Sequence, residues 1–74
     1  MGHLEPGIRL LGRAVLVTAI RDTQGRGSEL DRASAWQFLC ADTEAHYALL
    51  ELWCEAAGRD VRRTIEWARE ARHG

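Results

Sequence analysis

Cysteine and histidine are the side chains in this sequence best suited to metal binding or nucleophilic chemistry, and Cys40, His46 and Cys54 lie nearest one another along the chain. Their spacing, Cys-x5-His-x7-Cys, matches no standard zinc arrangement, and no fourth ligand is obvious. A cysteine–histidine nucleophile pair would also need an orienting acid and an oxyanion hole, and the sequence indicates neither. We therefore expect buried, reduced thiols, no metal, no cofactor and no enzymatic activity.

Arginine supplies all 10 basic side chains, and the sequence contains no lysine. This composition excludes a lysine nucleophile, a Schiff base and a Walker-type phosphate loop. Residues 52–65 have the order helix, glycine turn and arginine-led helix, which is superficially similar to a helix-turn-helix. In that interpretation Arg59, Arg62 and Arg63 face phosphates or guanine edges. The net charge of −1 argues against it, because DNA-binding domains usually present a basic surface.

Charge is distributed unevenly along the second half of the chain. Residues 42–57 contain no arginine and carry four acidic side chains, Asp42, Glu44, Glu51 and Glu55. Residues 58–74 contain five arginines and three acidic side chains. One interpretation is a pair of helices that attract each other and are otherwise solvated. The other is an acidic patch that docks on a basic partner.

Trp67 is the tryptophan that falls outside the apolar rows of the expected helices. It lies among charged residues, whereas Val61, Ile65 and Ala68 form the apolar row of that segment. A half-exposed tryptophan beside charges is typical of an interface anchor. The alternative is that its ring folds back against the first helix or the N-terminal arm.

The length of 74 residues allows one small domain, which we expect to span residues 1–74 with a flexible arm over residues 1–6. Apolar residues recur at helical spacing in four segments. The expected helices run over 8–23, from a cap at Ser28 to about Ala41, over 44–57, and over 61 to about 72. The predicted fold class is all-α, a compact bundle of about four short helices.

Capping residues support these boundaries. Ser28 with Asp31, the pair Asp42-Thr43, and Asp60 are predicted N-terminal caps, and Gly58 is a predicted helix-ending glycine. For the core we expect Trp36 and Leu39 from the second helix. The third helix should contribute a buried stripe, composed of His46, Leu49, Leu50, Trp53 and Ala57.

No segment of the sequence resembles a membrane span or a secretion signal. The longest apolar run, residues 14–17, is far shorter than the roughly 20 residues that a spanning helix requires. Arg9 and Arg13 interrupt the N-terminal apolar stretch, and no small-residue cleavage site follows it. We therefore expect a cytoplasmic protein that has no contact with a membrane.

Three short motifs in order resemble small accessory proteins encoded by phages and prophages. They are Ala-Ile-x-Asp at 19–22, an aromatic-leucine element at 36–39, and Cys-x-x-Ala-Gly-x-Asp-x-x-Arg at 54–63. The resemblance covers roughly residues 14–65, and it departs at Val61, where the pattern has proline. It implies a role in the contest between phage and host, as with anti-CRISPR proteins, which bind a host effector and block it.

The leading hypothesis is therefore a phage-type inhibitor that binds a host protein or ribonucleoprotein complex stoichiometrically. Its predicted contact residues combine the acidic segment with the arginine-rich one: Asp42, Glu44, Glu51, Glu55, Arg59, Arg62, Arg63 and Trp67. A small DNA-binding regulator is one alternative. A homodimeric structural protein is another, because a core this small often needs oligomerisation for stability.

Overall fold

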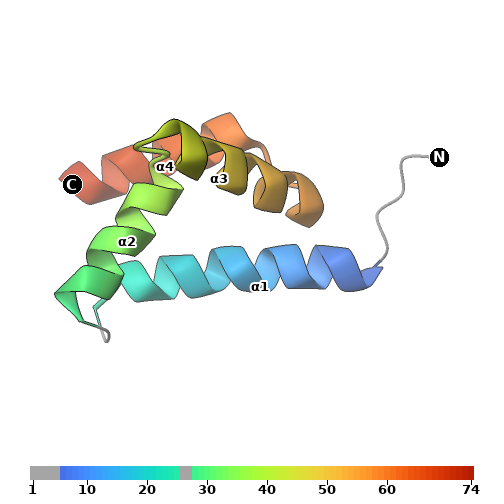
Figure 1. Ribbon diagram of the computed structural model, residues 1–74, viewed down its shortest axis with the longest axis horizontal. Coiled ribbons are helices and arrows are strands. Elements are labelled where there is room, and N and C mark those ends of the chain that lie inside the picture. The colour runs from blue at the N-terminus through green and yellow to red at the C-terminus, as the bar shows by residue number, and fades with distance from the viewer. Residues whose placement is uncertain (1–5, 26–27) are drawn as a thin grey trace.

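The computed structural model describes residues 6–25 and 28–74, and these residues form an all-α bundle of four helices (Figure 1). The helices are α1 (Pro6–Thr23), α2 (Glu29–Leu39), α3 (Glu44–Ala57) and α4 (Val61–His73). The predicted fold class is confirmed. The third helix has the predicted bounds, and the fourth ends one residue beyond the prediction.

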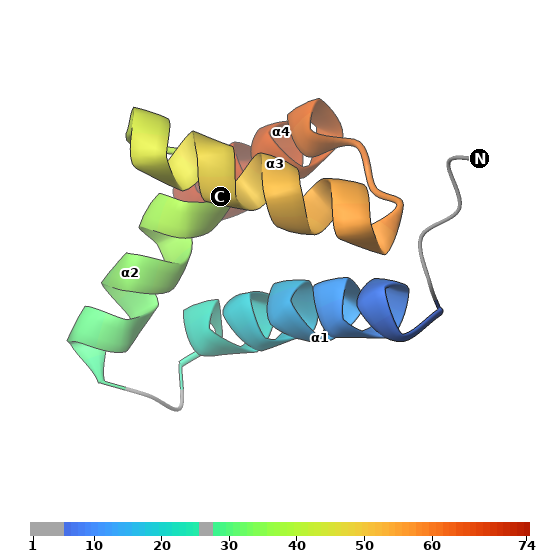
Figure 2. The same cartoon turned by 45° about the vertical axis from the view of Figure 1, so that its right-hand side comes forward.

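The four helices differ in which neighbours they contact. Helices α1 and α3 run antiparallel and side by side, while α2 crosses them at one end (Figures 1 and 2). Helix α4 packs on α2 and α3. Among the described residues, no Cα atom of α1 comes within 8 Å of a Cα atom of α4. The bundle is therefore open between its first and last helices.

Helix α1 begins at Pro6, two residues before the predicted start. Proline suits the first turn of a helix, because the N–H group that it lacks would have no partner there. The predicted arm over residues 1–6 is therefore wrong at its last residue, and residues 1–5 lie outside the described part of the chain. The predicted loop at 24–27 is described only for Gln24 and Gly25.

Helix α2 ends at Leu39, earlier than the predicted end near Ala41. Ala41 has a left-handed backbone with φ of 52°. Its N–H donates to the carbonyl of Phe38 (3.1 Å), and the N–H of Asp42 donates to that of Gln37 (3.0 Å). These two bonds form a Schellman motif, a helix ending in which glycine usually occupies the left-handed position. The sequence contains alanine there, so it does not signal this ending.

The predicted N-terminal caps form as expected. Ser28 and Asp31 make a reciprocal capping box, and the side chain of Asp60 accepts from the N–H groups of Arg62 and Arg63. In the pair Asp42-Thr43 it is Thr43 that caps α3, accepting from the N–H of His46. Each cap satisfies backbone N–H groups that have no partner inside the helix.

Gly58 ends α3 with a left-handed backbone, φ of 72°, as predicted. A left-handed residue costs an L-amino acid roughly 1–2 kcal/mol, whereas glycine adopts this conformation freely. The chain reverses here with only Arg59 and Asp60 between Gly58 and the first residue of α4.

The core consists of small and aliphatic side chains from all four helices. Its largest fully buried side chains are Leu39, Leu50, Cys40 and Cys54. Burial of Leu39 and Leu50 confirms the predicted packing of α2 and α3. Both cysteines are free thiols inside this core, as expected.

Other residues of the predicted core lie at its edge. Trp36 and Trp53 are partly buried and pack against the core. The predicted stripe is less buried than expected at His46, which is partly buried, and wrong at Leu49, which is 49% exposed. The residue that α2 buries beside Leu39 is Ala35, not Trp36. Periodicity identified the apolar side of each helix, but the limited neighbouring surface in a bundle of four helices leaves its edges uncovered.

Gly12 lies where the backbones of α1 and α3 come close together. A β-carbon built on Gly12 would lie 2.8 Å from the backbone nitrogen of Ala57 and 3.1 Å from the β-carbon of Ala56. Both of these alanines are buried. The two backbones can adopt this spacing only because all three residues are small.

We predict that Gly12→Ala destabilises the protein by about 1–3 kcal/mol, because the added methyl group meets backbone atoms that cannot move without shifting a helix. Gly7→Ala, in the same helix, is the matched control, since a β-carbon added there meets no described atom within 4 Å beyond its own turn of helix. Alanine is the better helix former by up to about 1 kcal/mol, so this control should be neutral or stabilising. Denaturant unfolding followed by circular dichroism measures both, and equal effects would contradict the close approach.

Candidate functional site

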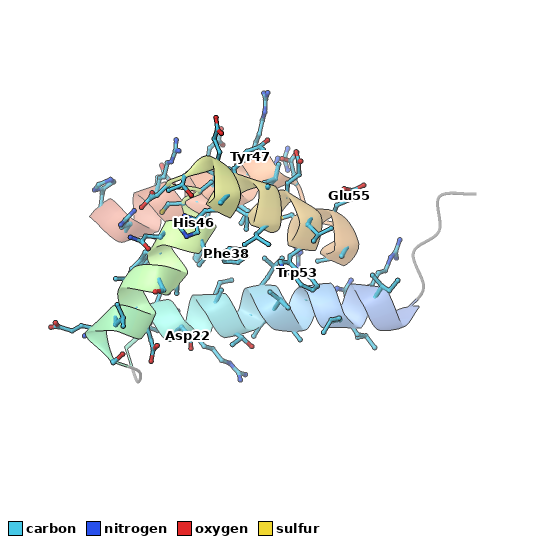
Figure 3. All side chains as sticks on the ribbon, in the orientation of Figure 1. Asp22, Phe38, His46, Tyr47, Trp53 and Glu55 are labelled. Atoms are coloured by element: carbon cyan, nitrogen blue, oxygen red, sulfur yellow. The ribbon has the colours of Figure 1, made fainter. Side chains whose placement is uncertain are left out.

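The exposed surface of α3 carries three carboxylates on one side. Glu44, Glu51 and Glu55 follow one another at intervals of seven and four residues, which places them on the same helical face. All three are exposed, and none makes an ion pair with another described residue. Glu55 points away from α1 (Figure 3). These three residues are called the acidic face below.

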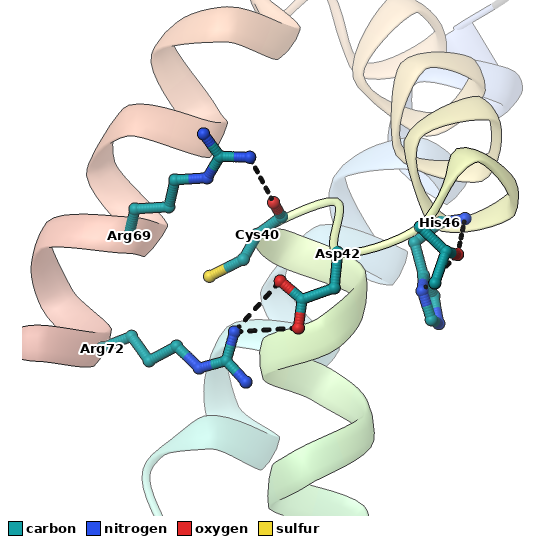
Figure 4. A network of polar contacts seen from close by, with 6 residues as sticks. Cys40, Asp42, His46, Arg69 and Arg72 are labelled. Atoms are coloured by element: carbon teal, nitrogen blue, oxygen red, sulfur yellow. Dashed lines mark hydrogen bonds and ion pairs between the residues drawn. The ribbon is translucent and has the colours of Figure 1, made fainter.

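Asp42, which was predicted with this group, differs from it in having an intramolecular partner. Both of its carboxylate oxygens accept from Nη1 of Arg72, at 3.1 and 2.9 Å (Figure 4). This ion pair raises the pKa of Arg72, and it joins the connection between α2 and α3 to the end of α4. Arg69 makes a neighbouring link by donating to the carbonyl of Cys40 at 3.4 Å.

A groove with a volume of about 400 Å³ lies between α1 and α4, whose described Cα atoms stay more than 8 Å apart. Its floor is aliphatic and comes mainly from α1. Its rim carries guanidinium groups and an indole. The lining residues are Arg13, Leu16, Val17, Ile20, Leu39, Arg59, Arg63, Thr64 and Trp67. No aspartate or glutamate lines it, so this surface, called the groove below, is apolar at its centre and positive at its edge.

The groove divides the predicted arginine-rich contact set. Arg59 and Arg63 line it together with Trp67, which is 44% exposed. Arg62 is exposed but does not line it, because it lies 100° around α4 from Arg63. Three of the predicted contact residues therefore meet at one place, while the acidic face lies on another helix.

Arg13, Val17 and Ile20 belong to the groove but were absent from the predicted site. With Leu16 they form an i, i+3, i+4, i+7 row along α1. That row is visible in the sequence, and its arginine is the signal that one end of it borders solvent. Nothing in the sequence indicates that α4 stays away from this row, so a site on α1 could not be predicted.

A second hollow, of about 360 Å³, lies between α1, α2 and α3. The rings of Phe38 and Trp53 lie in the space between α3 and α1 and contribute to its wall (Figure 3). Asp22 and Asp31 also line it, but neither faces a basic group within it. Its lining contains no histidine or cysteine beside these two carboxylates.

The structure does not bring Cys40, His46 and Cys54 together as a metal site. Among residues 6–25 and 28–74, no group of three or more histidine, cysteine or acidic side chains lies close enough to hold a metal. His46 is engaged locally, with its Nδ1 atom 2.8 Å from the hydroxyl of Thr43 (Figure 4). Burial raises the pKa of the Cys54 thiol, and the nearby charge of Asp60 acts in the same direction.

None of the described helices combines the length and the apolar character that a membrane span requires. Comparison with known protein families, with curated proteins and with solved structures finds no match to this chain.

We predict that Asp42→Arg lowers the free energy of unfolding by up to about 1 kcal/mol, because it removes an exposed ion pair and brings like charges together. Glu51→Arg makes the same charge change on the unpaired acidic face, and it should shift stability by less than about 0.5 kcal/mol. Denaturant titration in low salt compares the two variants. The difference should shrink in high salt, where surface charges are screened. Equal effects in low salt would contradict the ion pair of Asp42 with Arg72.

We predict that Cys40 and Cys54 resist alkylation in the native protein and react promptly when it is denatured. For Cys54, the raised pKa means that the folded state holds the thiol proton more tightly than the unfolded chain. Its contribution to stability is therefore complete below the ordinary thiol pKa and is lost as the pH rises through the higher folded value. Mass spectrometry after timed iodoacetamide treatment measures how fast each thiol is alkylated, and rapid labelling of the native protein would contradict the burial of the two cysteines.

Proposed function

We propose that this chain is a protein-binding module that inhibits a host effector by stoichiometric contact, in the manner of phage-encoded anti-CRISPR proteins. It would act in the cytoplasm of the host cell, on a protein or ribonucleoprotein complex. The contact surface is the groove between α1 and α4. The observation that carries this proposal is the meeting of Trp67, Arg59 and Arg63 with an apolar floor at one opening of the bundle.

The composition of the groove agrees with what is known of binding hot spots. Tryptophan and arginine are the residues most enriched there, and they act best beside apolar surface from which water is excluded. Trp67 has already lost part of its solvent contact in the free protein, so a partner has less to desolvate and order. Its rigid ring and the caps of α4 give the partner a preformed surface.

The acidic face contributes a second, electrostatic component to this function. Its carboxylates have no partner within the described chain, so they remain available to a basic surface. An effector that binds nucleic acid has a channel lined by arginine and lysine, which is complementary to this face. Rim charges of this kind mainly accelerate association, whereas the apolar anchor determines how long a complex lasts.

The resemblance at 19–22, 36–39 and 54–63 supplies the biological context of the proposal. Part of that pattern also builds the groove, because Ile20, Leu39, Arg59 and Arg63 lie within these motifs and line it. The same stretches therefore underlie both the phage-type resemblance and the surface that we assign to partner binding.

The test is restoration of phage growth in a panel of bacterial strains, each with one class of active CRISPR interference. Wild-type protein should restore plaque formation in at least one strain and co-purify with a saturating, fixed ratio of the effector. Trp67→Ala and Arg63→Glu should weaken effector binding by at least about tenfold, as expected for hot-spot positions. Charge reversal at Glu44, Glu51 and Glu55 should mainly slow association.

Arg62→Glu is the matched control, because it makes the same charge change next to Arg63 without touching the groove. A glutamate in the first turn of α4 is compatible with the helix dipole at both positions, so both variants should fold. Failure to inhibit any system would contradict the proposal. So would a shift of duplex DNA at low salt with higher affinity than any protein partner, since that result would favour the DNA-binding alternative.

A further inference from the structure

We propose that the groove takes an amphipathic α-helix of the partner, with its apolar residues on the floor and its carboxylates against the three rim arginines. This inference rests on the proposed function, because it names the chemistry of the partner at that same surface. It follows from the length of the groove, the state of its floor and the charge of its rim.

The length of the groove corresponds to a short stretch of helix. On α1 its lining runs from Arg13 to Ile20, which is about two helical turns or roughly 10 Å. On α4 it runs from Arg63 to Trp67, slightly more than one turn. A helix lying between them replaces the contact that α1 and α4 do not make with each other. Helix packing of this kind brings axes to within about 8–10 Å.

The floor of the groove offers apolar surface that the chain itself leaves uncovered. Leu16 and Leu39 are buried beneath it, whereas Val17 is 45% exposed and Ile20 is partly buried. Trp67 forms the opposite wall from α4. An amphipathic helix presents apolar side chains at i, i+3 or i+4, and i+7, which is the spacing needed to cover a floor of this length.

The rim determines the charge of the helix that binds. Arg13, Arg59 and Arg63 line the groove, are exposed, and form no ion pair with any described residue. A guanidinium group binds a carboxylate with two parallel hydrogen bonds. Three such groups around an apolar floor favour an occupant with glutamate or aspartate beside its apolar row.

A nucleic acid fits this surface less well than an acidic helix does. Phosphates would satisfy the arginines but would leave the aliphatic floor in contact with water or with polar backbone. The indole of Trp67 could stack on a base, so an oligonucleotide is included in the test.

The test uses fluorescence anisotropy with a labelled, alanine-based helical peptide of about four turns. Its apolar row is leucine at i, i+3 and i+7, flanked by glutamates, and the matched probe has lysine in place of each glutamate. The full-length protein should bind the glutamate peptide at least about tenfold more tightly than the lysine peptide. Binding should also quench or shift the fluorescence of Trp67, relative to Trp67→Phe.

Variants on the protein side make the assignment specific. Arg63→Glu should weaken binding of the glutamate peptide at least about tenfold and strengthen binding of the lysine peptide. Arg62→Glu should change neither affinity by more than about twofold. Val17→Asp places a charge on the exposed part of the floor and should weaken binding of both peptides. Thermal unfolding of each variant confirms that it is folded before binding is compared.

Several results would overturn the inference. Equal binding of the two peptides, or equal effects of Arg63→Glu and Arg62→Glu, would show that the rim does not select an acidic helix. Tighter binding of a single-stranded oligonucleotide that displaces the peptide would assign the groove to nucleic acid. A doubled mass in light scattering that Arg63→Glu abolishes would assign it to a second copy. If the effector binds through the groove while the acidic peptide does not, only this inference fails.

Discussion

The close contact between α1 and α3 at Gly12 is the constraint on which the rest of this structure depends. The missing side chain lets the backbone of α1 approach Ala56 and Ala57, at a distance that a β-carbon would not allow. This pairing occupies one side of α3, and α4 packs on another side together with α2. Among the described residues, α1 and α4 both pack on α3, but none of their Cα atoms come within 8 Å of each other.

The groove is a consequence of that arrangement, and it explains how a chain of 74 residues can present a concave surface. A bundle in which all helices touched their neighbours would bury Val17, Ile20 and Trp67 as core. Here these side chains border an opening, and α4 is retained instead by the core contacts of Ile65 and Ala68 and by the ion pair of Arg72 with Asp42. The core is therefore smaller than it would be if these side chains were covered.

Charge in this molecule is sorted by element, and it serves two different purposes. The charges of Arg72 and Asp42 pair with each other. Such an exposed pair contributes little stability, but it holds the end of α4 near the connection between α2 and α3. The rim arginines and the acidic face have no such partners among the described residues. The near-neutral total of −1 thus conceals two surfaces of opposite sign.

The sequence by itself determined where α2, α3 and α4 begin and where α3 ends, because caps at Ser28, Thr43 and Asp60 and the glycine at 58 act on their own backbone within a few residues. It also led to the prediction of a contact surface at Trp67 and its neighbouring arginines. Only the tertiary structure decided that Arg13 joins them, that Arg62 does not, and that Asp42 is engaged with Arg72. These outcomes depend on which helices touch, and that is set by side-chain volume between residues some 45 positions apart, such as Gly12 and Ala57. The spacing of residues along one helix carries no information about how closely that helix approaches another one far away in the sequence.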